Sequence, residues 1–280
     1  LLKQVSRGSS NLDDLDLNPL LVKTDPGENT RYCEKRDIND LPDTLDEKIE
    51  HLEKIGIDHL IIHPFDKKFS LLSAEQFIKE YLVEKLKLKH IIIGYDHRFG
   101  KGREASVSDL KEYSIEYNFI VDEIDAQEIE KIAISSTKIR NSINEGDLET
   151  TEKYLGRFFS LSGKVVKGDG LGKQIDYPTA NILIEDDYKI IPKDGVYYIR
   201  TTIDNKLYNG MMNIGHRPTI GNKAKSIEVN LFNFDRNIYD KIISVDVVVK
   251  IRDEKKFSSI NALKAQLAKD EEHCLKLINK

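Results

Sequence analysis

The chain has 280 residues, with 43 basic and 48 acidic side chains and a formal net charge of −5. This length favours two domains, and because no apolar run approaches the roughly 18 residues of a membrane-spanning helix, we expect no membrane partner. Cys33 and Cys274 are the only cysteines in the sequence, too few for a disulfide framework, so we expect a cytoplasmic protein.

The first half of the chain alternates between helical and strand patterns. Two capping boxes, each a hydroxyl residue followed three residues later by Glu or Gln, predict helix starts at Thr44 and Ser73. Two short apolar runs, His59–His63 and His90–Gly94, predict buried strands. This alternation indicates a parallel sheet with helices on its faces, and such sheets bind ligands beyond the carboxyl ends of their strands.

Two segments of this half have the composition of ligand-binding loops. Gly94–Arg103 follows a predicted strand and holds glycines, cations and aromatic residues, which suit an anionic aromatic ligand or a flexible, solvated turn. Ser135–Arg140 places hydroxyl residues at the start of a predicted helix that ends at Gly146. That start is consistent with a phosphate site or with an ordinary N-cap.

The pattern changes near residue 160. The net charge is −9 over residues 1–160 and +4 over residues 161–280, and neither half has the basic stripe of a nucleic-acid-binding protein. A small anionic substrate fits better than a polyanion. Short alternating runs predict six strands, which favour an antiparallel sandwich or closed barrel, followed by a helix capped by Ser259. The predicted strands are Leu161–Val166, Ala180–Ile184, Val196–Thr202, Lys206–Ile214, Ser226–Phe234 and Ile242–Ile251.

Three features of the second half are candidates for chemistry. The segment from Gly163 to Lys173 combines glycines, which let a backbone approach phosphate, with lysines that supply countercharge. Thr179 and Asn181, two residues apart at a strand entrance, offer oxygen ligands of the kind that Mg²⁺ prefers, or form a plain turn. Glu228 lies on the face opposite Ile227 and Val229, as a base in a cleft or as a solvent-facing carboxylate.

In their order and spacing these motifs resemble the bacterial bifunctional riboflavin kinase/FMN adenylyltransferase family. The resemblance runs from about Leu45 to the C-terminus. It rests on the loops and strand entrances above, together with Gly210–Thr219, Phe234, Arg252 and Phe257. It implies an α/β nucleotidylyltransferase domain with a Rossmann-like parallel sheet over residues 1–157. A six-stranded riboflavin kinase β-barrel with a C-terminal helix would follow over residues 158–280.

The resemblance also implies substrates, a metal and residue roles. ATP would phosphorylate riboflavin to FMN and then adenylylate FMN to FAD, with Glu228 as the catalytic base of the kinase and Thr179 and Asn181 holding Mg²⁺. Arg252 would bind flavin. The kinase nucleotide would be bound by the same Thr179 and Asn181 with Gly163, Lys164, Gly168, Gly170 and Gly172. Nucleotide or flavin in the adenylyltransferase would be bound by Gly94, Asp96, Phe99, Ser136, Thr137 and Arg140.

The sequence departs from the family pattern in three places. Members of the family normally begin with a strand and a Gly-x-Phe-Asp-Gly-x-His-x-Gly-His segment, whose histidines steady the phosphates in adenylyl transfer. These 280 residues do not contain that segment. Asp176 stands where Gly usually precedes the aromatic-Pro-Thr-Ala-Asn run, and Asp240 stands where Gly usually follows Tyr239. A carboxylate at Asp176 would either repel the ATP phosphates or help to hold the metal.

Two other functions remain open from the sequence. One is a nucleotidylyltransferase for another substrate with an appended barrel, which predicts no phosphorylation of riboflavin. The other is a non-catalytic flavin-binding protein, which would form neither FMN nor FAD. Nothing in the sequence indicates an oligomeric state.

Overall fold

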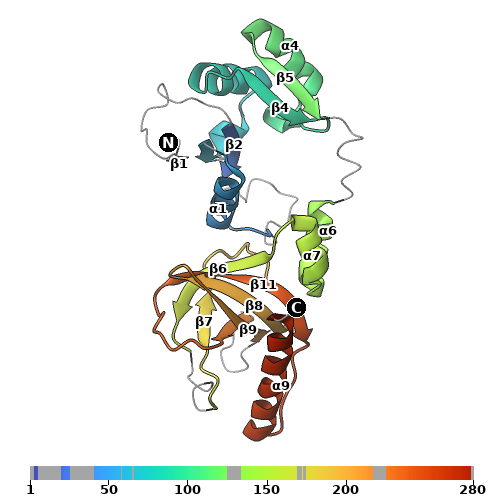
Figure 1. Cartoon of the computed structure of the whole chain (residues 1–280). Coiled ribbons are helices and arrows are strands. Elements are labelled where there is room, and N and C mark those ends of the chain that lie inside the picture. Colours follow the sequence, from blue (N-terminus) through green and yellow to red (C-terminus); the bar gives the residue numbers. More distant parts are fainter. Residues whose placement is uncertain are drawn as a thin grey trace. The chain divides into compact units, whose positions relative to one another are not determined.

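The computed structural model describes residues 3–5, 20–25, 41–57, 59–64, 66–124, 134–168, 172, 175–216 and 225–278. The chain divides into two compact units. The first comprises Leu1–Asp37 and Lys48–Ala133, and the second comprises Ile38–Glu47 and Ile134–Lys280. Figure 1 labels their helices and strands. The chain therefore passes between the units three times, once within helix α1 (Leu45–Ile55).

The first unit contains short parallel strand pairs and helices. Its strands are β1 (Lys3–Val5), β2 (Leu20–Asp25), β3 (His59–Pro64), β4 (His90–Gly94) and β5 (Ile120–Ile124). Its helices are α1 (Leu45–Ile55), α2 (Lys67–Ser70), α3 (Ala74–Gln76), the π-helix η3 (Phe77–Lys85), the 3₁₀ helix η4 (Lys101–Arg103) and α4 (Val107–Tyr117). β2 pairs with β3 and β4 with β5 in parallel, whereas β1 pairs with β3 antiparallel. The predicted parallel α/β class is confirmed.

Both predicted capping boxes are present. The Thr44 amide donates to Glu47 Oε2 (2.9 Å) and the Glu47 amide to Thr44 Oγ1 (3.2 Å), which starts α1. Ser73 and Gln76 exchange the equivalent bonds at 3.0 and 3.2 Å, which starts α3. Each box satisfies two backbone N–H groups that have no partner within the helix.

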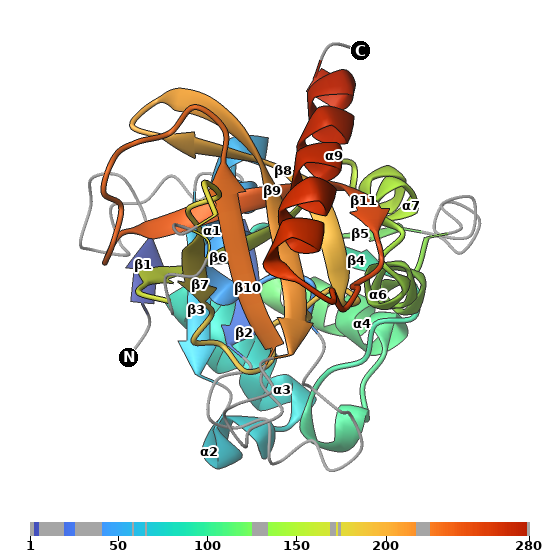
Figure 2. The same ribbon diagram turned by 90° about the horizontal axis from the view of Figure 1, so that it is seen from below.

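The second unit is a closed barrel with helices. It contains α6 (Ser136–Glu145), α7 (Leu148–Leu155), β6 (Phe159–Val166), β7 (Ala180–Leu183), β8 (Gly195–Ile203), β9 (Lys206–His216), β10 (Lys225–Leu231), β11 (Ile242–Arg252) and α9 (Ile260–Ile278). The six strands close in the order β10-β7-β6-β11-β8-β9, and all neighbours are antiparallel. The predicted barrel with a C-terminal helix is confirmed, and α9 lies against it beside β9 and β11 (Figure 2).

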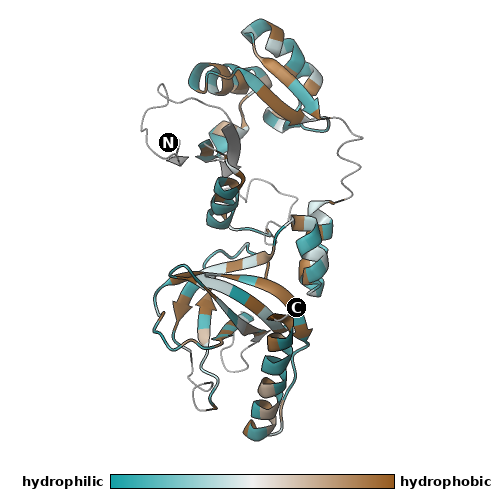
Figure 3. Ribbon diagram, in the orientation of Figure 1, coloured by the Kyte–Doolittle hydropathy of each residue, from teal (hydrophilic) through white to brown (hydrophobic). Residues whose placement is uncertain are grey.

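Alternation along the barrel strands separates two apolar clusters. Tyr197 and Ile199 of β8 belong to the cluster that fills the barrel, whereas Val196 and Tyr198 belong to a second cluster with Cys274 of α9. Successive strand residues point to opposite faces, so a single strand contributes both to the barrel core and to the surface on which α9 packs. Figure 3 shows the resulting alternation of hydrophobic and hydrophilic residues on the barrel strands.

One barrel strand differs from its predicted bounds. β10 ends at Leu231 and does not continue to Phe234, because Asn233 has a φ of 54° and turns the chain out of the ladder. The other barrel strands lie within about two residues of their predicted bounds, the uncertainty expected of strand ends. Asp204 and Asn205, a sequence typical of hairpin turns, connect β8 to β9 with φ values of 50° and 61°.

A buried ion pair fastens residues 41–47 to the barrel. The Lys189 ammonium, with a fully buried side chain, bonds Glu47, whose side chain is 2% exposed, and donates to the Pro42 and Ser160 carbonyls. Glu47 also accepts from the Ser162 amide at 2.8 Å. Burial lowers the pKa of Lys189, and the nearby Glu47 carboxylate opposes that shift. The start of α1 is thereby tied to the second unit.

Candidate kinase site on the barrel

Strand register places one residue from each barrel strand in a single row. Glu228 of β10 pairs with Asn181 of β7 on one side and with Asn213 of β9 on the other. Directly paired residues project to the same face of a sheet. The row continues from Asn213 to Val196 of β8 and Arg252 of β11, and from Asn181 to Val166 of β6.

The row lies on the outer face of the barrel. Ile227 and Val229, the neighbours of Glu228, belong to the core that fills the barrel, so Glu228 projects the other way, as the alternation predicted. Val196 belongs to the cluster beneath α9. The carboxylate of Glu228 and the amide of Asn181 therefore stand side by side on a surface that α9 borders.

The glycine-rich segment lies directly against this row. A Cβ on Gly168 would be 2.0 Å from Asn181 Nδ2, and a Cβ on Gly172 would be 2.2 Å from the Tyr177 carbonyl oxygen and 3.2 Å from Thr179 Oγ1. A side chain at Gly172 would collide with the backbone, and one at Gly168 would force either the segment or the Asn181 side chain to move. The sequence predicted Gly168, Gly172, Thr179, Asn181 and Glu228 separately, and the structure brings them together.

The remaining residues of that segment have other surroundings. A Cβ on Gly163 would be 2.5 Å from the Leu183 carbonyl oxygen, so this glycine permits close strand packing. The Lys164 ammonium lies 3.0 Å from Asp240 Oδ1. Gly170 lies outside the described residues, as does the Arg217–Thr219 part of the predicted Gly210–Thr219 motif.

The backbone explains both replacements of glycine by aspartate. Asp176 and Asp240 have φ values of 64° and 63°, the left-handed region that glycine adopts most easily and that Asp tolerates better than most residues. Each carboxylate is paired with a lysine: Asp176 with Lys264 of α9 at 2.5 Å and Asp240 with Lys164. The Asp176 side chain is 81% exposed, so its charge is both screened and partnered.

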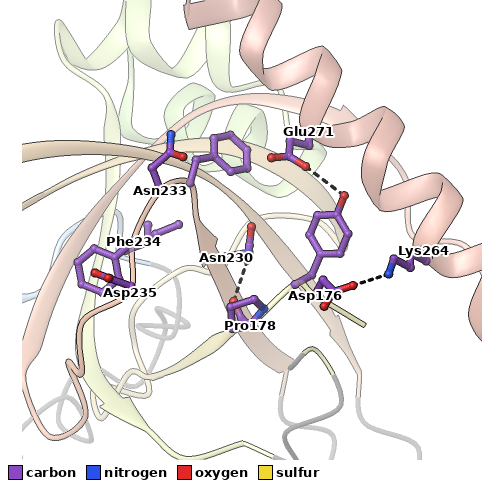
Figure 4. Close-up of a pocket in the computed structure, with 11 residues that line it drawn as sticks. Asp176, Pro178, Asn230, Asn233, Phe234, Asp235, Lys264 and Glu271 are labelled. Carbon is purple, nitrogen blue, oxygen red and sulfur yellow. Dashed lines mark hydrogen bonds and ion pairs between the residues drawn. The ribbon is translucent and has the colours of Figure 1, made fainter. Parts of the chain in front are cut away.

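A pocket of about 610 Å³ opens beside the row (Figure 4). Asp176, Tyr177 and Pro178 form one side, the segment from Asn230 to Asp235 forms another, and Lys264 and Glu271 of α9 form a third. Asn230 Nδ2 donates to the Pro178 carbonyl at 2.8 Å, and the Tyr177 hydroxyl donates to Glu271 at 3.0 Å. Burial, and secondarily Glu271, raises the pKa of Tyr177.

The charges around this pocket favour some ligand groups over others. Asp176, Asp235 and Glu271 contribute three carboxylates against the single ammonium of Lys264. This excess of negative charge disfavours the binding of phosphate. It suits hydroxyl and ring N–H groups of a ligand, because carboxylates accept hydrogen bonds from them. The aromatic rings of Tyr177 and Phe234 add surfaces for a flat ring.

The residues predicted for adenylyl transfer fall in both compact units. Gly94, Asp96 and Phe99 belong to the first, where the Phe99 ring lies 6.4 Å from that of Phe77. Asp96 is exposed, in the turn that the His97 amide closes by donating to the Gly94 carbonyl.

The other three predicted residues begin α6, which belongs to the second unit. The Ser135 hydroxyl caps this helix by accepting from the Lys138 amide at 3.3 Å, and Arg140 donates to Thr137 Oγ1 at 3.2 Å. Ser136 and Thr137 occupy the first turn, where backbone N–H groups are free of helical partners.

Two family models match the chain: riboflavin kinase over residues 155–278 and FAD synthetase over residues 22–138. A protein named bifunctional riboflavin kinase/FMN adenylyltransferase from Buchnera aphidicola (subspecies Schizaphis graminum) is 44% identical over 84% of this chain and 76% of its own length. The chain belongs to the bifunctional riboflavin kinase/FMN adenylyltransferase family.

Two further relatives carry the same family name, and one solved structure with a different title is similar in fold. The proteins of that name from Escherichia coli K12 and Listeria monocytogenes are 36% and 38% identical, each over 81% of this chain and 72% of its own length. A crystal structure titled macrolide-efflux protein from Streptococcus pneumoniae has a TM-score of 0.78 at 31% identity, covering 90% of this chain and 82% of its own. No helix among the described residues combines the length and apolar character required to cross a membrane.

Proposed function

We propose that this chain phosphorylates riboflavin to FMN on the barrel row and adenylylates FMN to FAD, each time with ATP. Its membership of the family supports both activities. The observation that carries the kinase assignment is the cross-strand pair of Glu228 and Asn181, with Gly168 packed against that same Asn181. A base, an amide and a glycine-lined approach for phosphate thus occupy one surface.

Phosphorylation on this row needs one base and little covalent chemistry. Glu228 takes the proton of the terminal ribityl hydroxyl as that oxygen forms a bond to the γ-phosphorus of ATP. The bond from this phosphorus to the β–γ bridging oxygen breaks, and ADP leaves. Positioning and charge neutralisation account for most of the acceleration in such transfers.

Thr179 and Asn181 fit a Mg²⁺ ion by their chemistry. Their hydroxyl and amide oxygens, with the neighbouring Glu228 carboxylate, are hard donors, and the close approach of Gly168 to Asn181 leaves room there for a backbone but no side chain. The described residues contain no cluster of three His, Cys, Asp or Glu that could hold a metal alone. Mg²⁺ often uses few protein ligands together with waters and substrate phosphates, whose charge it neutralises when bound.

We assign the two substrates of the kinase to opposite ends of the row. Gly163, Lys164, Gly168, Gly170 and Gly172 belong to the segment that covers ATP. Lys164 would supply positive charge opposite the ATP phosphates, and in this structure its ammonium forms an ion pair with Asp240. The acidic pocket beside Asn230 suits the base and ribose of the nucleotide better than its phosphates. Arg252, at the far end of the row, would contact the flavin.

For the second reaction we propose contacts from two separate segments of residues 1–157. Gly94, Asp96 and Phe99 would lie near the flavin or adenine, and Ser136, Thr137 and Arg140 near the nucleotide phosphates. The backbone N–H groups of Ser136 and Thr137, which precede the capped Lys138 amide in the first turn of α6, support a phosphate contact there. The FMN phosphate would attack the α-phosphorus of ATP and release pyrophosphate.

We place both reactions in the cytoplasm, with small molecules as the partners and neither nucleic acid nor membrane involved. A sequence with two cysteines is typical of a reducing compartment. Burial raises the pKa of the Cys274 thiol to about 12, so this thiol is unreactive at neutral pH.

The test is a product assay with purified protein, riboflavin and Mg-ATP, in which FMN and FAD are separated from riboflavin. We expect both products, and no FMN after a chelator removes divalent cations. FMN without FAD would contradict the adenylyltransferase assignment and leave the kinase assignment standing. Neither product would contradict both and favour a flavin-binding protein.

A further inference from the structure

Arg252 is held in one orientation by an acidic residue of α9. Its Nε donates to Asp270 Oδ1 (3.0 Å) and Oδ2 (2.9 Å), and its Nη2 donates to Oδ2 (2.8 Å). Its Nη1 donates to the Asp253 carbonyl at 3.0 Å. The Asp270 side chain is 2% exposed and the Arg252 side chain 13%, so water competes little for either group.

These bonds leave a defined part of the guanidinium available. Arginine has five N–H groups, and the bonds above use one on Nε, one on Nη1 and one on Nη2. The second N–H of each terminal nitrogen has no acceptor among the described residues. One N–H on Nη1 and one on Nη2 therefore remain to donate to the oxygens of a ligand, or to the acceptors of a flat ring.

Asp270 is itself fixed. Gln266, one turn earlier on α9, donates from Nε2 to Asp270 Oδ1 at 2.8 Å. The Phe257 ring lies 5.7 Å from the guanidinium carbon of Arg252. A charged side chain with this many fixed neighbours loses little further freedom when a ligand binds, which is the advantage of pre-organisation.

We propose that Asp270 is a positioning residue of the kinase site, which orients the remaining N–H groups of Arg252 toward the flavin substrate. This inference rests on the proposed function, because it takes the flavin side of the row to be the end that holds Arg252. Asp270 touches no substrate and acts only through Arg252. The alternative is a structural role, in which the pair merely anchors α9 to β11.

A double-mutant cycle separates these two roles. Riboflavin affinity is measured by the change in flavin fluorescence on binding, which needs no turnover, for the full-length wild type, Asp270→Asn, Arg252→Gln and the double variant. We expect Asp270→Asn to weaken riboflavin binding about 10- to 100-fold, the usual range for hydrogen bonds to charged groups. The KM for ATP should change less than about threefold.

The double variant gives the decisive comparison. Asp270→Asn alone leaves a buried arginine unpaired, whereas the double variant removes both charges and can be compared with Arg252→Gln even if the single variant fails to fold. Because Asp270 acts through Arg252, the double variant should bind riboflavin as Arg252→Gln does. Additional weakening of more than about threefold would overturn the proposal, as would wild-type affinity in folded Asp270→Asn.

Two controls complete the design. Glu272→Gln removes a carboxylate from an exposed pair on the same helix and should leave riboflavin affinity unchanged. Wild-type affinity in Arg252→Gln would overturn the inference while FMN formation by the wild type still supports the kinase assignment. A wild type that neither binds riboflavin nor forms FMN would overturn the proposed function and this inference with it.

Discussion

The residues proposed for the two reactions are distributed differently in the molecule. Asn181, Glu228 and Arg252 belong to strands of one closed barrel, where hydrogen-bonded neighbours fix their spacing, and Thr179 directly precedes strand β7. The residues proposed for adenylyl transfer come from both compact units, three from each. A closed sheet leaves little freedom between its strands, so the kinase row is assembled by folding of the barrel alone.

This difference shows what strand register contributes to a site. Each residue of the row occupies a position in its own strand, and hydrogen-bonded pairing between the six strands aligns these positions in one row. Residues in separate units have no common ladder that fixes their spacing. We therefore expect substitutions in the barrel to have sharper, more local effects on FMN formation.

The largest predicted effect on stability comes from Lys189→Met, which leaves Glu47 buried without its cation. Loss of one partner of a buried pair costs about 3–5 kcal/mol, and urea unfolding should show a decrease of this size in the free energy of unfolding. The barrel ladder itself is untouched, so FMN formation below the unfolding transition should stay near wild type.

The matched control is Lys276→Met, since Lys276 pairs with Glu272 on the surface of α9 with both side chains more than half exposed. Exposed pairs contribute about 0–1 kcal/mol, so this variant should unfold nearly as the wild type does. Equal losses in the two variants would show that burial of the Lys189 pair has no particular importance.

Gly168→Ala tests the close approach at the centre of the row. The added methyl would lie 2.0 Å from Asn181 Nδ2, so either the glycine-rich segment or Asn181 must move. Overpacking of this kind costs about 1–3 kcal/mol, and we expect the KM for ATP to rise about 5- to 100-fold while riboflavin affinity is retained.

Gly156→Ala is the control in the same unit. At the native φ of 70° an alanine backbone is strained, but the new methyl group would meet no atom within 4 Å. It should lower thermal stability without changing the KM for ATP. An unchanged KM in Gly168→Ala would show that ATP does not approach the row from this side.

Asp176→Gly should have the smallest effect. Because the carboxylate is exposed and paired with Lys264, we expect it neither to repel the ATP phosphates nor to ligate the metal. ATP affinity, titrated at several Mg²⁺ concentrations, should match the wild type within about fivefold, the upper limit for an exposed pair. Tighter binding at every Mg²⁺ concentration would mean that Asp176 repels ATP, and a greater need for Mg²⁺ would mean that it ligates the metal.

Local features of the fold could be predicted from the sequence because short-range chemistry determines them. The capping boxes at Thr44 and Ser73, the hairpin at Asp204 and the outward face of Glu228 each depend on a few neighbouring residues. The end of β10 was mispredicted because apolar residues continue as far as Phe234, although the strict alternation already stops at Leu231 and the positive φ of Asn233 turns the chain.

Features that depend on contacts between distant residues were not predicted. Asn213 is an ordinary polar residue in its own strand, and only its register with Glu228 makes it part of the row. Asp270 resembles any surface carboxylate of a charged helix until the structure shows it buried against Arg252. Its neighbours in the sequence give one signal, since Leu267 and Cys274 lie on the same packed side of α9.

The central claim is that phosphorylation of riboflavin takes place at Glu228, and Glu228→Gln tests it most directly. The variant keeps the size and hydrogen bonding of the side chain but removes the base. With ATP labelled in its γ-phosphate, we expect label transfer to riboflavin to fall about 10²- to 10⁴-fold, the usual contribution of a general base. Riboflavin affinity, followed by flavin fluorescence, should stay at the wild-type value. A variant that transfers label at more than about a tenth of the wild-type rate would contradict the assignment of the base and of the row around it.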